Sequence, residues 1–139
     1  EGTEAGAFWV GEAKGRIGAV YRLMNRLDEA DRYLEPALRW FRKLGATLGA
    51  AANMKLMADV AFRRGDHKRA VHLIAFSEAV DDRMGGGPPK ELMLVAIGGD
   101  QIRAAAAEQV DHETVERWWA EGSAMDVDEA IAYALGENT

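Results

Sequence analysis

The sequence has 139 residues, a net charge of −6 and a hydrophobic content of 48%, which is typical of a single globular domain with a substantial core. It contains no cysteine, which excludes disulfides, thiolate metal ligands and a cysteine nucleophile. No apolar run approaches the roughly 18 residues of a membrane-spanning helix.

The charge is unevenly distributed along the chain. Residues 1–80 hold 13 Lys/Arg against 10 Asp/Glu, a net +3, whereas residues 81–139 hold 4 against 13, a net −9. The overall negative charge argues against general nucleic-acid binding, but the split could steer a partner or a neighbouring domain. The N-terminal stretch EGTEAGAF has neither a Met nor a signal-like segment, so we expect the cut end of a longer protein. The lack of cysteine fits a cytoplasmic location.

The first half of the chain favours helix almost everywhere, because Ala, Leu, Arg, Glu and Met are plentiful. We predict helices over about 5–25, 27–44, 48–64 and 66–83. Gly45 is expected to end the second helix, and in the pair Gly65-Asp66 the glycine ends the third helix and the aspartate caps the fourth. Pro36 falls inside the second helix and predicts a kink rather than an end.

The second half begins with Gly85-Gly86-Gly87-Pro88-Pro89, the strongest break in the sequence. A fifth helix is predicted to start there, to bend or split at Gly98-Gly99, and to continue to about residue 108. Asp111 and Asp126 are predicted to cap a sixth and a seventh helix, and Glu129 lies where it can bond back to the second cap.

The first four predicted helices form two similar units forty residues apart. Gly18 aligns with Ala58, and Leu34 aligns with Ile74. Small residues fall where helices must approach closely, and large apolar residues fill the spaces between them. This pattern resembles tetratricopeptide-like helical hairpins, although the common period is about 34 residues. We therefore predict an all-α fold with two tetratricopeptide-like hairpins over 1–84. Residues 85–139 form C-terminal capping helices packed on them in one structural domain, because such hairpins are stabilised by stacking.

A second resemblance depends on the segment RRGDHKRAVHLIAFSEAVDDRMGGGPP and on later residues. Those are Trp119-Ala120-Glu121-Gly122, Met125, Glu129-Ala130-Ile131 and Ala134-Leu135. Together they resemble the C-terminal tetratricopeptide-like region of bacterial signal-transduction ATPases and LuxR-type transcriptional regulators, also found with adenylate cyclase domains. The resemblance implies a non-catalytic sensor and assembly module, with the ATPase and output domain elsewhere. The sequence departs from this family at Val115, where a larger aromatic is usual, and at Trp118, where a small residue is usual.

Motifs for catalysis, cofactors or metals are absent from the sequence. There is no G-x-x-x-x-G-K-[ST] loop and no H-E-x-x-H, and His67 and His72 are five residues apart, so they do not share a helix face. We predict that the protein is not an enzyme and has no cofactor and no metal site.

A binding surface is predicted where the first helix of each hairpin would line a concave groove. The residues at the matching positions are Arg22, Arg26, Lys55, Asp59, Phe62 and Arg63. This mostly basic strip could bind an acidic peptide or protein, a carboxylate effector, or the protein's own acidic tail or upstream domains. A merely solvated helix face is the alternative.

Two other functions stay open from the sequence. One is a small-molecule pocket between the last hairpin and the cap, bordered by Trp118 and Met125, and the other is a homodimerisation arm. We predict that Trp119 is buried, tying the sixth helix to the seventh and to the hairpins, and that Trp118 lies at the core edge, where it could contact a partner. No membrane and no direct nucleic-acid partner is expected.

Overall fold

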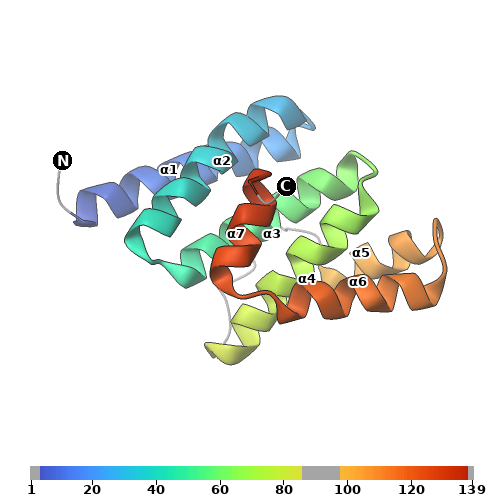
Figure 1. Ribbon diagram of the computed structural model, residues 1–139. Coiled ribbons are helices and arrows are strands. Elements are labelled where there is room, and N and C mark those ends of the chain that lie inside the picture. Colours follow the sequence, from blue (N-terminus) through green and yellow to red (C-terminus); the bar gives the residue numbers. More distant parts are fainter. Residues whose placement is uncertain (1–3, 86–97, 138–139) are drawn as a thin grey trace.

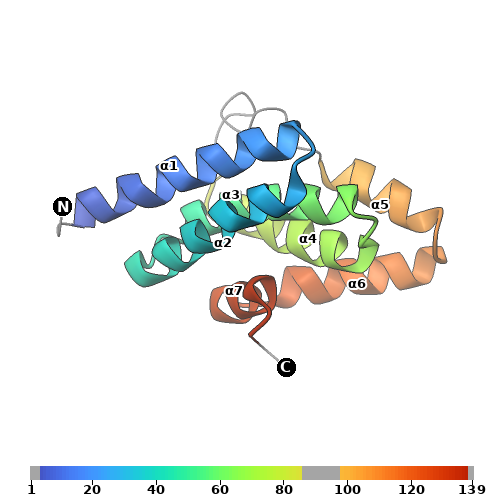
Figure 2. The same cartoon turned by 90° about the horizontal axis from the view of Figure 1, so that it is seen from above.

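The computed structural model describes residues 4–85 and 98–137, and no strand occurs within these two ranges. Seven helices occupy them, with bounds α1 (Glu4–Leu23), α2 (Leu27–Leu44), α3 (Thr47–Arg63), α4 (His67–Arg83), α5 (Gly99–Ala107), α6 (His112–Ala124) and α7 (Val127–Leu135). α1 pairs with α2 and α3 pairs with α4, and α5 and α6 lie beside α4 (Figure 1). Figure 2 shows α1 along one edge of the molecule and α6 and α7 along the opposite edge. The predicted all-α fold of tetratricopeptide-like hairpins is confirmed.

The forty-residue repeat is visible in the backbone of the turns. Asn25 and Gly65 end the first helix of each hairpin with φ of 58° and 80°, and Gly45 and Gly85 follow the second helices with φ of 66° and 87°. This left-handed conformation suits Gly and Asn at helix ends, because other side chains clash there. The two hairpins therefore use the same turn geometry at the same spacing.

The two helices of the first hairpin approach closely at glycines of α1. A Cβ on Gly18 would lie 2.7 Å from Cγ of Leu34, so this buried leucine of α2 fills the space that a side chain at position 18 would need. α2 continues through Pro36 rather than ending there, as predicted. The core then runs through both hairpins into the C-terminal helices, and its largest fully buried apolar side chains include Leu34, Leu38, Met54, Met57, Ile74, Phe76, Ile102 and Ile131.

The C-terminal helices begin where the sequence predicts. The Asp111 carboxylate accepts a hydrogen bond from the Thr114 amide at 2.7 Å, and Asp126 accepts from the Glu129 amide at 2.8 Å while the Glu129 carboxylate bonds back at 3.0 Å. α5 begins at Gly99, after an extended Gly98 (φ −92°, ψ 166°), and the part of the predicted fifth helix before residue 98 lies outside the described residues. The predicted helix start near Pro88 lies outside the described residues.

α6 and α7 attach to the hairpins in different ways. α6 packs on α4, and α7 contacts α2, α3 and α4. Arg69 of α4 donates a hydrogen bond to the carbonyl oxygen of Ala134 at 2.8 Å, so it satisfies the C-terminal end of α7. Arg42 of α2 bonds Glu137 just beyond α7 at 2.8 Å. Among the described residues, no helix is long and apolar enough to cross a membrane.

Candidate functional site

The predicted strip contains a buried ion pair that ties α1 to α3. Nη1 of Arg22, whose side chain is 0% exposed, pairs with Oδ2 of Asp59. Arg63, one turn further along α3, donates through Nε to the same Oδ2 at 3.3 Å. One carboxylate therefore holds a buried guanidinium and a partly exposed one. A buried charge is tolerated only when it is paired, so the ion pair with Asp59 favours the burial of Arg22.

The expectation that Arg22 faces an open groove is wrong. Arg22 lies on the same face of α1 as Gly11, Gly15 and Gly18, which are separated from it by whole numbers of turns. All three glycines are buried, and their closest side-chain neighbours come from α2 and α3. This face of α1 is directed into the protein, so the Arg22 side chain is buried as well.

The other residues of the strip also have partners within the chain. Nζ of Lys55 lies 2.9 Å from Oδ2 of Asp81, and both side chains are less than one-fifth exposed. Arg26, just after α1, pairs with Glu29 and lies over the Tyr21 ring at 5.2 Å from its centroid. Phe62 is partly buried against the core. The structure thus brings Arg22, Asp59 and Arg63 together and leaves Arg26 in a separate local cluster.

Arg63 has unused hydrogen-bonding capacity on a partly exposed side chain. Its side chain is 30% exposed, and it bonds Asp59 through Nε. Among the described residues, neither of its two terminal Nη nitrogens has a hydrogen-bond acceptor. A guanidinium in this state can still hold a carboxylate with two parallel bonds.

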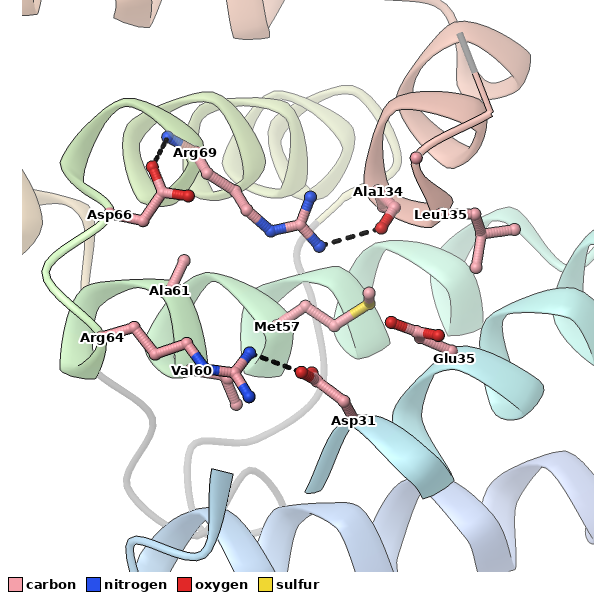
Figure 3. Close-up of a pocket in the computed structure, with 11 residues that line it drawn as sticks. Asp31, Glu35, Met57, Val60, Ala61, Arg64, Asp66, Arg69, Ala134 and Leu135 are labelled. Carbon is pink, nitrogen blue, oxygen red and sulfur yellow. Dashed lines mark hydrogen bonds and ion pairs between the residues drawn. The ribbon is translucent and has the colours of Figure 1, made fainter. Parts of the chain in front are cut away.

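A cavity of about 310 Å³ lies on another part of the surface, between α2, α3, α4 and α7. Arg64 reaches toward Asp31 and Arg69 reaches toward Ala134 across its walls (Figure 3). Arg64 also bonds Asp28 at 2.7 Å. The hydrogen bond to Asp31, and after it the bond to Asp28, raise the pKa of Arg64 above its ordinary value, because both carboxylates stabilise the charged form. Both arginines are used to join helices, so this cavity marks a structural junction. Neither Trp118 nor Met125, which were expected to border a pocket, lines it.

Sequence reasoning missed this junction, although a signal existed. Arg64 and Arg69 flank the Gly65-Asp66 turn, where a helix end and a helix start meet and side chains of both can reach a neighbouring hairpin. Basic residues beside such a turn can pair with acids in the first turn of an earlier helix, as Arg64 does with Asp28 and Asp31.

A buried histidine links the cap to the second hairpin. Nδ1 of His72 lies 2.9 Å from the Tyr133 hydroxyl on α7, and Nε2 lies 2.9 Å from Oε1 of Glu121 on α6. The bond to His72 lowers the pKa of Glu121, and burial raises the pKa of Tyr133. Within the described parts of the chain, no group of three His, Asp or Glu residues is arranged to hold a metal ion. The arrangement orients three helices and contains no nucleophile beside an oxyanion-binding site.

The comparison with protein-family models agrees with the hairpin geometry. Residues 9–75 match the family model described as tetratricopeptide repeat. This part of the chain is a tetratricopeptide-like region. Such regions generally mediate protein–protein interactions and are typically non-catalytic scaffolds. No curated protein and no solved structure matches the chain.

The two adjacent tryptophans lie outside the tetratricopeptide-like region, and one prediction about them is wrong. Trp119 is only partly buried, as is Trp118. The Trp119 ring packs on α5 rather than on α7: the Arg103 guanidinium lies 3.8 Å from its centroid, and its Cη2 would be 2.8 Å from a Cβ on Gly99. Gly99 is therefore the residue that makes room for this ring. Trp118 packs at the core edge as expected, and its contact with a partner stays a prediction.

Proposed function

We propose that this chain is the non-catalytic sensor and protein-interaction module of a cytoplasmic bacterial transcriptional regulator of the LuxR type. In this role it binds a peptide, protein or effector on the face formed by α1 and α3, and it thereby controls an attached ATPase and output domain. The tetratricopeptide-like region supports the interaction role, and the sequence resemblance over residues 110–135 supports the regulator context. We further propose that residues 1–84 and 85–139 act as hairpins and cap of one domain.

The observation that carries the binding role is the arrangement of Arg63 on α3. Asp59 is already shared with buried Arg22, so it is a poor competitor for the exposed end of the Arg63 guanidinium. Phe62 is next to Arg63 and offers part of its ring, and Lys55 is eight residues away along the same helix face. A carboxylate beside an apolar side chain fits this surface best, because guanidinium and carboxylate match in charge and geometry.

Control of an attached domain then follows from differential affinity. A ligand shifts a conformational equilibrium only when it binds one state more tightly than the other. Asp59 and Arg22 connect α3 with α1, so a partner bound at Arg63 acts on a group that helps set the contact between the two hairpins.

The binding role is tested with a labelled acidic peptide of sequence EEFEE and a matched neutral peptide, QQFQQ. Fluorescence polarisation is measured with the wild-type chain, with Arg63→Glu, and with Arg32→Glu as a control on an exposed position of α2. We expect the acidic peptide to bind more tightly than the neutral one, and Arg63→Glu to weaken it by at least about tenfold, the effect of losing one charge-assisted contact. Equal affinities for both peptides, or an unchanged affinity in Arg63→Glu, contradict the proposal.

The regulator context is tested separately from the gene. A coding sequence upstream that contains a phosphate-binding loop followed by similar repeats supports this context. A different upstream domain contradicts the context and leaves the peptide-binding result unaffected.

A further inference from the structure

The outward face of α1 is unusually apolar for a helix at the edge of the molecule. Val10 and Ile17 are each 42% exposed, Val20 is 48% exposed and Met24, in the turn that follows, is 55% exposed. With exposed Ala13 between them, these residues are spaced by alternating steps of three and four, so they form one stripe along the helix. Figures 1 and 2 both place α1 at an outer edge of the fold. Contiguous apolar surface of this kind marks an interaction site more often than a solvated face.

The two edges of the helical array differ in character. At the edge opposite α1, the exposed residues of α6 are mainly charged and include Glu113, Glu116 and Arg117. The end of a helical-repeat array needs such a polar outer face to stay in solution, whereas an interior repeat is covered by a neighbour on each side. α1 has an apolar outer face, and its opposite face is buried against α2 and α3 through its glycines. It therefore has the character of the first helix of an interior repeat.

The second hairpin shows how the same face is used elsewhere in this protein. Forty residues after the stripe on α1, the equivalent positions on α3 are Ala50, Asn53, Met57 and Val60, and all four are buried. α2, the second helix of the preceding hairpin, packs along this face, and α7 borders its edge. Nδ2 of Asn53 donates a hydrogen bond to the carbonyl oxygen of Leu34 on α2 at 2.9 Å. The outward face of α1 is thus the counterpart of a surface that joins one hairpin to the next.

We propose that the outward face of α1 is covered by the second helix of a preceding tetratricopeptide-like hairpin, in the way that α2 covers α3. This contact continues the existing interface between the two hairpins by one repeat. Only residues 45 and 46 separate α2 from α3. A helix that packs on α1 in the same way ends close to the start of α1, so the covering hairpin belongs to the same polypeptide and is joined by a similarly short turn.

The differences between α1 and α3 define the chemistry of the covering helix. Just after α3, Arg64 bonds Asp28 and Asp31 near the start of α2, whereas Met24 occupies the corresponding position after α1. A carboxylate placed against Met24 would lose water without gaining a partner. Ala13 stands where α3 has the hydrogen-bonding Asn53. The covering helix should therefore have apolar residues near its start, where α2 has its acidic pair.

The experiment compares this chain with the natural polypeptide lengthened at its N-terminus by one further repeat, and Ile17→Glu is introduced into both. Ile17 is exposed in this chain, so the substitution should change the urea midpoint of unfolding by no more than about 0.3 M. In the longer polypeptide it places a carboxylate between two helices and should lower the midpoint by about 1 M. Leu48→Glu is the matched control, because Leu48 is an apolar residue of α3 that is 38% exposed and lies outside the α1 face. Its effect should be the same in both polypeptides.

Circular dichroism spectra verify that all variants fold. Equal effects of Ile17→Glu in the two polypeptides overturn the proposal, as does an upstream segment that forms no helical hairpin. A midpoint difference that appears only at high protein concentration assigns the face to a second copy and also overturns it. An upstream hairpin without a phosphate-binding loop ahead of it supports this inference while it contradicts the regulator context. The peptide-binding role of Arg63 is unaffected by any of these results.

Discussion

α6 and α4 approach each other closely at Gly122. A Cβ at this position would lie 2.4 Å from the carbonyl oxygen of His72 and 3.0 Å from Cβ of Ala75. The nearer atom belongs to the backbone of α4, so it cannot rotate away as a side chain would. To reach the usual contact distance of about 3.5 Å, Gly122→Ala must separate the two helices by about 1 Å.

Two opposing effects set the size of the change. Alanine is favoured over glycine within a helix by about 1 kcal/mol. Against this, overpacking of a tight interface costs about 1–3 kcal/mol, and the upper end applies because the obstacle is backbone. Moving α6 also strains the 2.9 Å contact between His72 and Glu121. We expect Gly122→Ala to lower the free energy of unfolding by about 2 kcal/mol, with the favourable helix propensity already included.

The assay is urea unfolding followed by circular dichroism, with Gly15→Ala as the control. Among the described residues, a Cβ on Gly15 would meet only the Asn53 side-chain oxygen at 3.2 Å, and a side-chain amide can move by a few tenths of an ångström. The propensity gain should therefore prevail, and Gly15→Ala should be about 0.5 kcal/mol more stable than wild type. The reasoning is refuted if Gly122→Ala is as stable as wild type, or if both variants shift in the same direction.

Three further predictions concern the ion pair, the cap and a turn. Asp59→Asn removes the carboxylate that pairs with buried Arg22. In urea melts it should lower the free energy of unfolding by about 3–5 kcal/mol, and a loss below 1 kcal/mol would contradict the burial of the pair. The bond to His72 holds the pKa of Glu121 below its ordinary value of 4.5. The Glu121 carboxylate therefore stabilises the folded state fully above that pH, and this stabilisation is lost as the pH falls through the pKa of the folded state. Wild type should thus be more stable than Glu121→Gln at pH 6, and this difference should shrink in acid; a constant difference would argue against the bond. Gly65→Ala places an alanine at φ of 80° and should lower the free energy of unfolding by about 1 kcal/mol, measured in thermal melts. An unchanged stability would indicate that the turn has a different conformation.

Helix starts and ends could be predicted from the sequence because their causes are local. Asp111 and Asp126 cap their helices through amides three residues away, and Gly45 and Gly65 supply the left-handed residue after a helix. The forty-residue repeat also follows from short apolar and small-residue patterns. None of these features depends on which distant segment lies alongside.

The candidate site was harder to predict, because long-range packing determines it. Arg22 carries a charge, and charge alone suggests an exposed side chain, yet Asp59 lies 37 residues further along the chain and draws it inward. Trp119 was expected against α7, but the missing side chain at Gly99 opens a place for its ring on α5. In both cases the deciding residue belongs to another helix, and only the tertiary structure shows the pairing.

α7 also connects parts of the molecule that could otherwise move independently. It rests on α2, α3 and α4 at once, and arginines from both hairpins, Arg42 and Arg69, hold its C-terminal end. The angle between the two hairpins therefore cannot change without loosening one of these two attachments. Amide exchange in this short helix would report the curvature of the whole array, even for an event that occurs on the opposite side of the protein.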